Sequence, residues 1–383
     1  MYLVKNITDL IKQSTKLILE KTLLIIILSI VFLNTNLSAT EKFVGFIESL
    51  EGKANKEEKE EIINLNEFDQ IFINQKIAID LNSSATISFI DNSVLTLGGD
   101  SEFIIEKFDN ISQVPSFILS ITKGKFTFES GSIAKAINGL MTITLPGKKK
   151  KDLEVDTPTM ILGLRGTLIT GSNIDDNKKV SLVKDSTNKL GIVDVTVTVN
   201  GQSQTTQITE EAEGFDLSGD NEIKKTILSE EEVTSTKKKM NEATVKASTQ
   251  SAEKMDRAIT KKLAAGTIPD ANGDGVADLK DVEIFKAGLL EMQEAKLEYI
   301  VEESKEDLSI LSEIIVNSES DQSMQLMEDM METNADSAAL LMTEIVEQDF
   351  DIFSHVAKAE TGNFEELRET IITEMIEDQS EFA

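Results

Sequence analysis

The sequence predicts an all-β domain of the sandwich, roll or barrel-like type, followed by an α-helical region. From residue 43 to about residue 215, short apolar runs alternate with turn-forming residues. Strands spaced roughly every 8–12 residues are typical of such β-folds. After Gly219 the apolar residues recur at helical spacing instead, which favours helices. At 383 residues the chain is long enough for two or three domains.

The first 39 residues are typical of a targeting segment. Lys12, Lys16 and Lys21 precede an apolar run at 22–33, which is shorter than the roughly 20 residues of a membrane-spanning helix. Small residues follow up to Ala39, so we expect residues 1–39 to be a signal peptide. An uncleaved signal anchor is the alternative, because the stretch before the apolar run is long. Either way, we expect the rest of the chain in the periplasm, secreted or at the cell surface.

The composition argues against several classes of function. A formal net charge of −30 and a pI near 4.4 disfavour nucleic acid and anionic membrane surfaces as partners, because both attract cationic faces. The chain has no Cys, and its one His is His355 in the acidic tail. An ordinary surface or core His is the simpler interpretation of that residue. Carboxylates are abundant, but none lies in a recognisable catalytic motif, so we expect a protein that is not an enzyme.

The β-region contains a series of short predicted strands. Turn chemistry separates several of them, for example at Asp91-Asn92-Ser93. The predicted strands are 43–47, 71–73, 77–79, 85–90, 94–97, 103–108, 117–121, 125–128 and the tract around Arg165.

The stretch from 152 to 171, DLEVDTPTMILGLRGTLITG, is the most specific part of the β-region. Thr157-Pro158 predicts an extended entry, because Pro fixes its own φ and restricts the residue before it. Gly163 and Gly166 interrupt an apolar run, which in a strand indicates a bulge or a close backbone approach. Arg165 is a lone cation between them. We expect it to be buried and paired, as the anchor of a polar network inside the fold.

Several segments together resemble the FecR-domain family over residues 43–215. Gly52 follows the first strand, and 191–199 and 211–214 match the closing strand and turn. The segments between them are ISFIDNSVLTL (Ile87–Leu97), ITKGKFTF (Ile121–Phe128), TPTMILGLRGT (Thr157–Thr167) and Lys179–Leu182. Arg165-Gly166-Thr167 is the most specific element. The resemblance implies an all-β periplasmic module of the bacterial envelope that binds or signals. The sigma-regulating members also carry a cytoplasmic segment, a membrane span and a secretin-like domain; this sequence shows none of these, so we do not expect an anti-sigma role.

Helices are predicted after the β-domain, which we place at 40–222. Ser229 and Glu232 have the spacing of a capping box, in which each side chain covers the other residue's backbone N–H. Gly266 is a stop signal, because Gly is favoured just after a helix. We expect residues 223–266 to be a half-exposed helical connector, because apolar residues are sparse there.

A single acidic loop at 270–281 has the pattern of a calcium site. Calcium prefers six to eight oxygen ligands, and a 12-residue loop supplies them from positions 1, 3, 5, 7, 9 and 12. Gly275 stands at position 6, where the loop turns sharply. The loop resembles a dockerin or thrombospondin-type repeat more than an EF-hand sensor, because its last ligand is Asp and not Glu. An acidic turn without metal is the alternative. The predicted Ca²⁺ ligands are Asp270, Asn272, Asp274, the Val276 carbonyl, Asp278 and Asp281.

An acidic α-helical region follows this EF-hand-like loop. We place the loop and an amphipathic helix at 267–301, and further helices around 308–315, 324–331, 338–346 and 364–376 within an acidic region, 302–383. From Val282 to Ala383 there are 27 Asp and Glu against five Lys and Arg. The methionines of this region are either an adaptable binding groove or, more simply, core. The run Lys148–Lys151 is either a site for an anionic glycan or lipid headgroup or, more simply, a solvated loop.

We therefore interpret the chain as an extracytoplasmic protein that is not an enzyme. Its β-domain is expected to bind or signal through an envelope protein or glycan, with one structural Ca²⁺. The alternative is a surface or adhesive structural protein in which calcium braces the linkage between domains. No nucleic-acid partner is expected, and membrane contact only through an uncleaved N-terminal segment.

Overall fold

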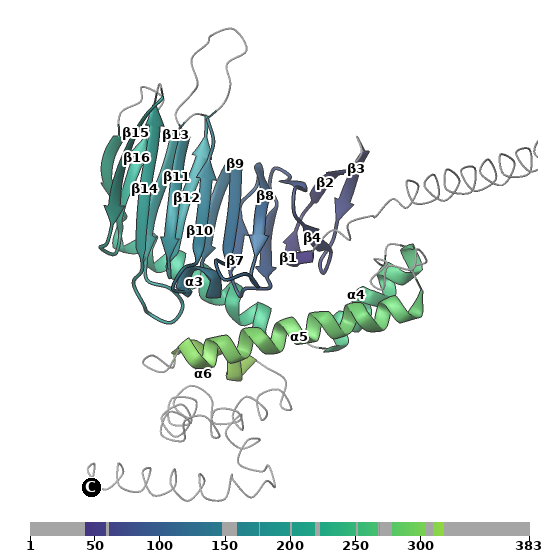
Figure 1. Ribbon diagram of the computed structural model, residues 1–383. Helices are drawn as coiled ribbons and strands as arrows, with labels where there is room; N and C mark the ends of the chain where they lie inside the picture. Colours follow the sequence, from purple (N-terminus) through teal and green to yellow (C-terminus); the bar gives the residue numbers. More distant parts are fainter. Residues whose placement is uncertain are drawn as a thin grey trace, which may run out of the picture. The chain divides into compact units, whose positions relative to one another are not determined.

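The computed structural model describes residues 43–58, 61–147, 159–175, 177–199, 201–218, 223–249, 252–266, 268, 278–303 and 309–317. All of them belong to one of the two units into which the chain divides, residues 42–383. Strands dominate up to residue 227 and helices follow (Figure 1). The predicted order, a β-domain and then helices, is therefore confirmed.

Seventeen strands lie within the described residues and form two sheets that share β9 (Ser116–Glu129). Sheet A has the order β4-β1-β6-β7-β9-β12-β13-β16-β17. Its other strands are β4 (Gln70–Phe72), β1 (Phe43–Glu51), β6 (Ser84–Phe89), β7 (Val94–Leu97), β12 (Leu168–Ile174), β13 (Asn177–Val183), β16 (Glu213–Leu217) and β17 (Ile223–Ile227).

Sheet B has the order β3-β2-β5-β8-β9-β10-β11-β14-β15. Its other strands are β3 (Glu61–Leu65), β2 (Ala54–Glu58), β5 (Lys76–Ile79), β8 (Ser101–Asp109), β10 (Leu140–Leu145), β11 (Thr159–Arg165), β14 (Ile192–Val199) and β15 (Gln202–Ile208). All of these pairings are antiparallel except that of β10 with β9.

The long strand β9 connects the two sheets. Residues 116–123 pair with β8 in sheet B, and residues 124–129 pair with β7 and β12 in sheet A. The sequence predicted two strands here, at 117–121 and 125–128. That prediction is wrong, because the chain continues through Gly124 without a turn and only changes its partners.

The core lies between the two sheets. Ile87, Leu95, Phe128, Ile169 and Leu182 face it as one cross-strand row of sheet A. Their neighbours along each strand point to the opposite face, because strand side chains alternate. The Phe117 ring meets three other rings edge-on, those of Phe89, Phe108 and Phe128.

The described helices are α2 (Ser132–Lys135), α3 (Glu230–Ser248), α4 (Ala252–Ala265), α5 (Leu279–Glu303) and α6 (Ser309–Asn317). The capping box of Ser229 and Glu232 is confirmed at the start of α3. Gly266 follows the last residue of α4 with φ of 66°, as its stop signal predicted. No helix among the described residues has both the length and the apolar character needed to cross a membrane.

The connector predicted at 223–266 differs from the structure. Its first residues form β17, the edge strand of sheet A, and two helices follow. Helix α3 is also packed more closely than expected: Met240 and Ala243 are buried against Val94, Leu168 and Val183 of sheet A. Residues 302–383 are described only at 302–303 and 309–317, where α6 confirms the helix predicted around 308–315. The helices predicted around 324–331, 338–346 and 364–376, the methionines from Met324 to Met342 and His355 lie outside the described residues. Lys148–Lys151 and residues 1–42 lie outside them too.

Candidate functional site

Helix α5 docks on the β-domain through an apolar contact at one end. Phe285 and Leu289 of α5 are buried with Met255 and Ile259 of α4. The same cluster contains Phe46 and Phe68 of the β-domain, whose rings stack 6.1 Å apart. Burial of side chains of this size supplies roughly 1.5–3 kcal/mol each. This contact sets the direction in which the rest of α5 crosses the domain.

Further along α5, the side chain of Lys296 is buried against the β-domain. The residue is 6% exposed, and its Nζ donates a hydrogen bond to the backbone carbonyl of Asn92, 2.7 Å away. Asn92 belongs to the turn between β6 and β7 and has φ of 68°. Burial lowers the pKa of Lys296, whereas the charges of Glu129 and Asp91 oppose that shift.

Hydrogen bonds within the turn stabilise the conformation in which it contacts Lys296. Asp91 is 2% exposed, and its carboxylate accepts hydrogen bonds from the Ser93 backbone N–H at 3.1 Å and the Ser93 hydroxyl at 2.8 Å. The Gly131 N–H donates to the Ser93 Oγ at 2.8 Å. Burial raises the pKa of Asp91, and the hydrogen bonds from Ser93 and the charge of Lys296 lower it in part.

Glu129, at the end of β9, supplies a second buried carboxylate. The hydroxyl of Ser186 donates to its Oε1 at 2.5 Å, while its buried Oε2 has no hydrogen-bond partner within the described part of the chain. Burial raises the pKa of Glu129, against the opposing charge of Lys296. Glu129 and Lys296 are therefore coupled: removal of either charge leaves the other buried with less compensation.

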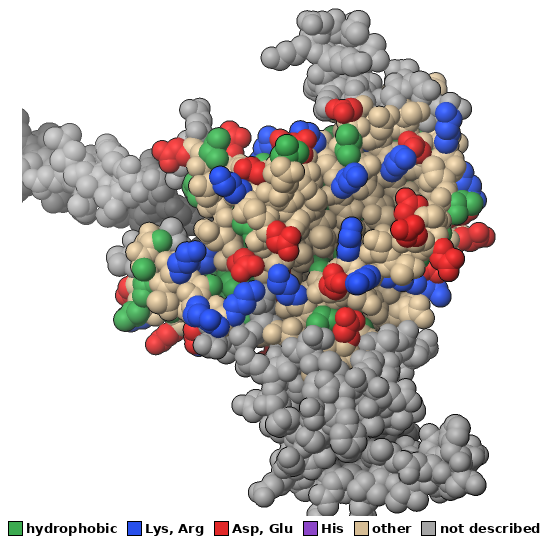
Figure 2. Space-filling model, turned by 180° about the vertical axis from the view of Figure 1, so that it is seen from behind, with side chains coloured by type: hydrophobic (Ala, Val, Ile, Leu, Met, Phe, Trp, Pro, Cys, Tyr) green, Lys and Arg blue, Asp and Glu red, His purple; other side chains and the backbone are tan. Residues whose placement is uncertain are grey.

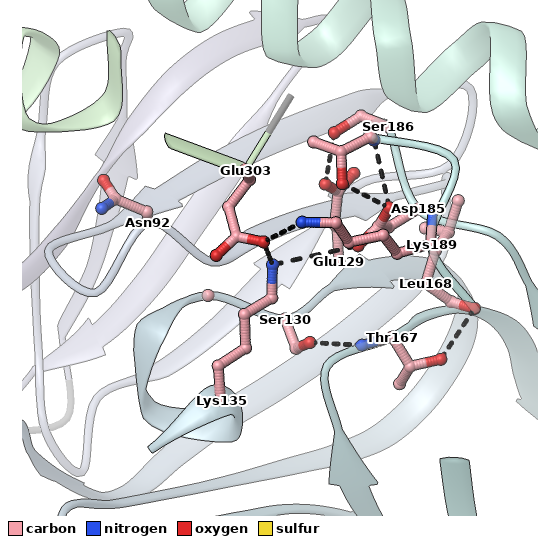
Figure 3. Close-up of polar contacts among 12 residues, drawn as sticks. Asn92, Glu129, Ser130, Lys135, Thr167, Leu168, Asp185, Ser186, Lys189 and Glu303 are labelled. Atoms are coloured by element: carbon pink, nitrogen blue, oxygen red, sulfur yellow. Dashed lines mark hydrogen bonds and ion pairs between the residues drawn. The ribbon is translucent and has the colours of Figure 1, made fainter. Parts of the chain in front are cut away.

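Glu303, near the end of α5, accepts from two lysines of the β-domain (Figure 3). Lys135 Nζ lies 2.9 Å and Lys189 Nζ 2.8 Å from the Glu303 carboxylate. Lys135 also lies 3.9 Å from Asp185 and 4.8 Å from the centre of the Tyr299 ring. We call Asp91, Glu129, Lys135, Asp185, Lys189, Lys296 and Glu303 the buried charge cluster; Lys135, Lys189 and Glu303 form its partly exposed rim.

The cluster predicts a response to acid through Glu303. Burial would raise the pKa of Glu303, but hydrogen bonds from Lys189 and Lys135 lower it below its usual 4.5. A lowered carboxyl pKa stabilises the fold above the usual value, and this contribution is lost as the pH falls through the lowered one. We expect the protection of the amides at the end of α5, after correction for the intrinsic pH dependence of exchange, to fall below about pH 4.5. Glu303→Gln should lose this part of the pH dependence; an unchanged profile in that variant would contradict it.

Thr167 of the predicted motif is hydrogen-bonded to Ser130, which follows Glu129 of this cluster. Its backbone N–H donates to the Ser130 Oγ at 2.7 Å (Figure 3). The Ser130 N–H donates in turn to the Thr167 carbonyl at 2.9 Å. Gly166 has φ of 58°, a conformation that favours glycine, and it turns the chain from β11 in sheet B to β12 in sheet A. The motif thus fixes Ser130, the residue after Glu129.

The predicted burial of Arg165 is wrong. Its side chain is 66% exposed and pairs with Asp194 of β14 at 2.9 Å, on the outer face of sheet B. The expected pairing is therefore present, but the pair lies at the surface. Alternation explains the difference: Leu164 faces the core, so its neighbour faces solvent. Thr157 and Pro158 lie outside the described residues.

These contacts predict losses of different size for Ser130→Ala and Arg165→Ala. Ser130→Ala leaves the buried Thr167 N–H without its acceptor, and we expect a loss of about 1–3 kcal/mol in unfolding free energy. Arg165→Ala breaks an exposed ion pair, which is worth less than about 1 kcal/mol. Chemical denaturation of both variants measures the difference. A larger loss in Arg165→Ala than in Ser130→Ala would contradict the assignment.

Of the predicted calcium ligands, the structure describes Asp278 and Asp281, at the start of α5. The Asp278 backbone N–H donates to Asp281 Oδ2 at 2.7 Å, and the Lys280 N–H donates to Asp278 Oδ1 at 2.8 Å. Both carboxylates therefore cap the helix, which begins at Leu279. Asp270, Asn272, Asp274 and Val276 lie outside the described residues, so the calcium site stays a prediction.

A groove of about 730 Å³ lies between α3 and the outer face of sheet A. Its floor is a cross-strand row of hydroxyl side chains that runs in register from Thr86 through Thr96, Thr127 and Thr170 to Ser181. A hydroxyl floor of this kind can donate and accept hydrogen bonds to a polar ligand.

Figure 2 shows one face of the molecule, where Lys and Arg are interspersed with Asp and Glu and most of the area is backbone and uncharged polar side chains.

Residues 75–186 match the family model described as FecR protein. No curated protein matches the chain. The matched segment is less than a third of the sequence and lies within the β-domain. It supports the predicted FecR-type domain, which indicates a signalling or regulatory protein of the envelope. Four members of the buried charge cluster lie within the match, namely Asp91, Glu129, Lys135 and Asp185; Lys189, Lys296 and Glu303 lie outside it.

Sequence reasoning did not find the buried charge cluster. The sequence predicts a turn at Asp91-Asn92-Ser93, but nothing in it indicates that a lysine binds to the Asn92 carbonyl. Lys296 stands seven residues after Leu289 and four before Ile300, on the apolar side of α5, so a lysine there was the available signal of a buried partner. Glu129 gave no such signal, because it directly follows Phe128 and so falls on the face opposite the core side of its strand, where a Glu is ordinary.

Proposed function

We propose that this chain is a signalling or regulatory protein of the bacterial envelope that is not an enzyme. In this proposal the FecR-type β-domain is the binding module, and α5 is the element that responds to binding. The FecR match over residues 75–186 carries the proposal. It is supported by the contacts of Lys296 and Glu303, through which α5 meets the matched segment at Asn92 and Lys135.

We infer that the partner, an envelope protein segment or a glycan, binds in the groove on sheet A. Support comes from its hydroxyl floor and from α3, which lines the groove with Thr236, Lys239 and Lys246. Helix α3 contacts α5 as well, because Gln293 of α5 donates to the Ser248 carbonyl at the end of α3 at 2.9 Å. A ligand that displaces α3 would therefore disturb the docking of α5.

Transcript profiling in the source bacterium tests this proposal. A strain that lacks the chain should change a defined set of transcripts, and the parent chain should restore them. Thr127→Arg blocks the floor of the groove, whereas Thr142→Arg places the same side chain on the outer face of sheet B as a matched control. We expect restoration by Thr142→Arg alone. No transcript change on deletion would overturn the regulatory role, and loss of surface attachment instead would favour an adhesive protein. Restoration by Thr127→Arg would reject the groove but keep the regulatory role.

Calcium binding at Asp270–Asp281 is part of the proposal as a brace for the start of α5. Four Asp side chains in one short loop repel each other, and a bound cation replaces that repulsion with coordination. With Asp as its last ligand, the loop is expected to bind Ca²⁺ with a Kd of about 10⁻⁵ to 10⁻³ M. Calorimetry on the full chain and on Asp274→Ala, in about 0.15 M salt to screen diffuse binding by exposed carboxylates, measures this. Equal heats from both proteins would refute the site.

The proposal also places the β-domain outside the cytoplasm, after removal of residues 1–39. N-terminal sequencing of the exported protein should then begin near Thr40. Recovery of an intact Met1 from the membrane fraction would show an uncleaved anchor.

A further inference from the structure

Strand β15 is an open edge of sheet B. Among the described residues it pairs with β14 alone, over seven residues in unbroken register from Val193–Ile208 to Val199–Gln202. Its sequence, QSQTTQI, contains no charged residue and no Pro. Natural edge strands are usually protected by charges, Pro, bulges or short length, because an exposed edge is a template for another strand. This edge has none of those protections.

The side-chain contacts show which backbone groups of β15 point outward. Thr205 Oγ1 lies 2.9 Å from Thr196 Oγ1, Ser203 Oγ lies 2.8 Å from Thr198 Oγ1, and Gln207 donates to Asp194 at 2.6 Å. Such close side-chain contacts are typical of the pairs in an antiparallel ladder that do not exchange backbone hydrogen bonds. The N–H and C=O groups of residues 203, 205 and 207 are therefore directed away from β14.

The other three sheet edges differ from β15. β4 has only three residues. β17 carries Lys224 and Lys225, and Thr226 and Ile227 line the groove under α3. β3 has five residues and begins at Glu61, so it presents fewer outward backbone groups. Of the described edges, β15 is the one that is both long and uncharged.

We propose that the β15 edges of two copies of this chain pair antiparallel about a two-fold axis at Thr205. This register places residue 203 opposite 207, and 205 opposite 205, in the partner copy. Each outward residue then faces an outward residue, so the three N–H and three C=O groups of each copy are all used. A two-fold interface must be self-complementary. The Gln, Ser and Thr side chains meet this requirement, because each both donates and accepts.

The interface is small, and this sets its strength. A seven-residue strand buries well below the roughly 800 Å² per partner of a standard protein interface. The dimer is therefore expected to be reversible and to form at micromolar or higher concentration. The net charge of −30 opposes association, and salt weakens this repulsion.

Sedimentation equilibrium of the full chain tests the dimer. We would measure from about 1 to 300 µM, a range suited to a weak interface, in about 0.15 M salt. Thr205→Pro removes the N–H at the axis and, because that group does not bond β14, an edge strand can tolerate it. Thr205→Lys places two like charges opposite each other. Thr205→Val is the matched control, which keeps the outward N–H and the β-propensity.

The parent and Thr205→Val should dimerise, while Thr205→Pro and Thr205→Lys should associate at least about tenfold more weakly, a change of about 1.4 kcal/mol or more. Circular dichroism and thermal unfolding check that each variant is folded. A parent that stays monomeric over the whole range overturns the proposal. A dimer that survives both substitutions in folded protein also overturns it, because the interface then lies elsewhere.

Discussion

Replacement of Lys296 by Met is expected to loosen α5 from the β-domain. The substitution keeps the length of the side chain but removes the charge that offsets Asp91 and Glu129, and it leaves the Asn92 carbonyl without its donor. Loss of one partner from a buried charged group costs about 3–5 kcal/mol. A loss of this size raises the equilibrium constant for the opening of α5 by about 100-fold or more. Amide hydrogen exchange in α5 at neutral pH should accelerate by the same factor.

Lys286→Met is the matched control for this prediction. Lys286 lies on the same helix and pairs with Asp256 at 2.6 Å, but both side chains are partly exposed. An exposed pair contributes less than about 1 kcal/mol, so exchange in α5 should change little. Equal acceleration in both variants would mean that the helix depends on its general charge and not on the buried contact of Lys296.

The second large effect is expected for Gly131→Ala. A Cβ at this position would lie 1.9 Å from the Asp91 carbonyl oxygen and 2.5 Å from the Ser93 nitrogen. Both are backbone atoms of the turn that receives Lys296, so the turn itself has to move. The movement strains the hydrogen bond from the Ser132 N–H to the Asp91 carbonyl, now 2.7 Å. Overpacking of this kind typically costs about 1–3 kcal/mol, and we expect about 3 kcal/mol or more because rigid backbone is displaced.

Gly288→Ala in α5 is the corresponding control. Nothing lies within 4 Å of the position that a Cβ would occupy there, and Ala is favoured over Gly inside a helix by about 0.5–1 kcal/mol. Thermal unfolding should therefore show a small gain for Gly288→Ala and a large loss for Gly131→Ala. A Gly131→Ala protein as stable as the parent would contradict the close approach.

Most strands that the sequence predicted have a clear apolar side, although β10 has one too and was missed. β1, β5, β6, β7 and β8 each carry buried apolar residues at alternate positions, and β7 was predicted with the same bounds as in the structure. The strands that it missed include edge or near-edge strands such as β2, β3 and β15. Their residues are mostly charged or uncharged polar, because only part of an edge strand faces the core. Periodicity therefore gives little signal for them.

The candidate site depends on tertiary contacts that periodicity does not encode. Lys296 is 204 residues from the turn that it contacts, and no local pattern connects the two. Arg165 illustrates the opposite error: a cation inside an apolar strand was expected to be buried, but a strand has two faces and Arg165 lies on the solvent side. Thr167 contributes to the site through its backbone N–H, which every residue except Pro carries. The residue type therefore gives little indication of this contact.

A double-mutant cycle between Lys296 and Glu129 tests most directly the claim that α5 is fastened by the buried charge cluster. The opening free energy of α5 would be measured by hydrogen exchange in the parent, Lys296→Met, Glu129→Gln and the double variant. We predict that the double variant is more stable than the sum of the single losses implies, by at least about 1 kcal/mol, because coupled residues deviate from additivity. Additivity within about 0.5 kcal/mol would contradict the claim, since independent sites behave in that way.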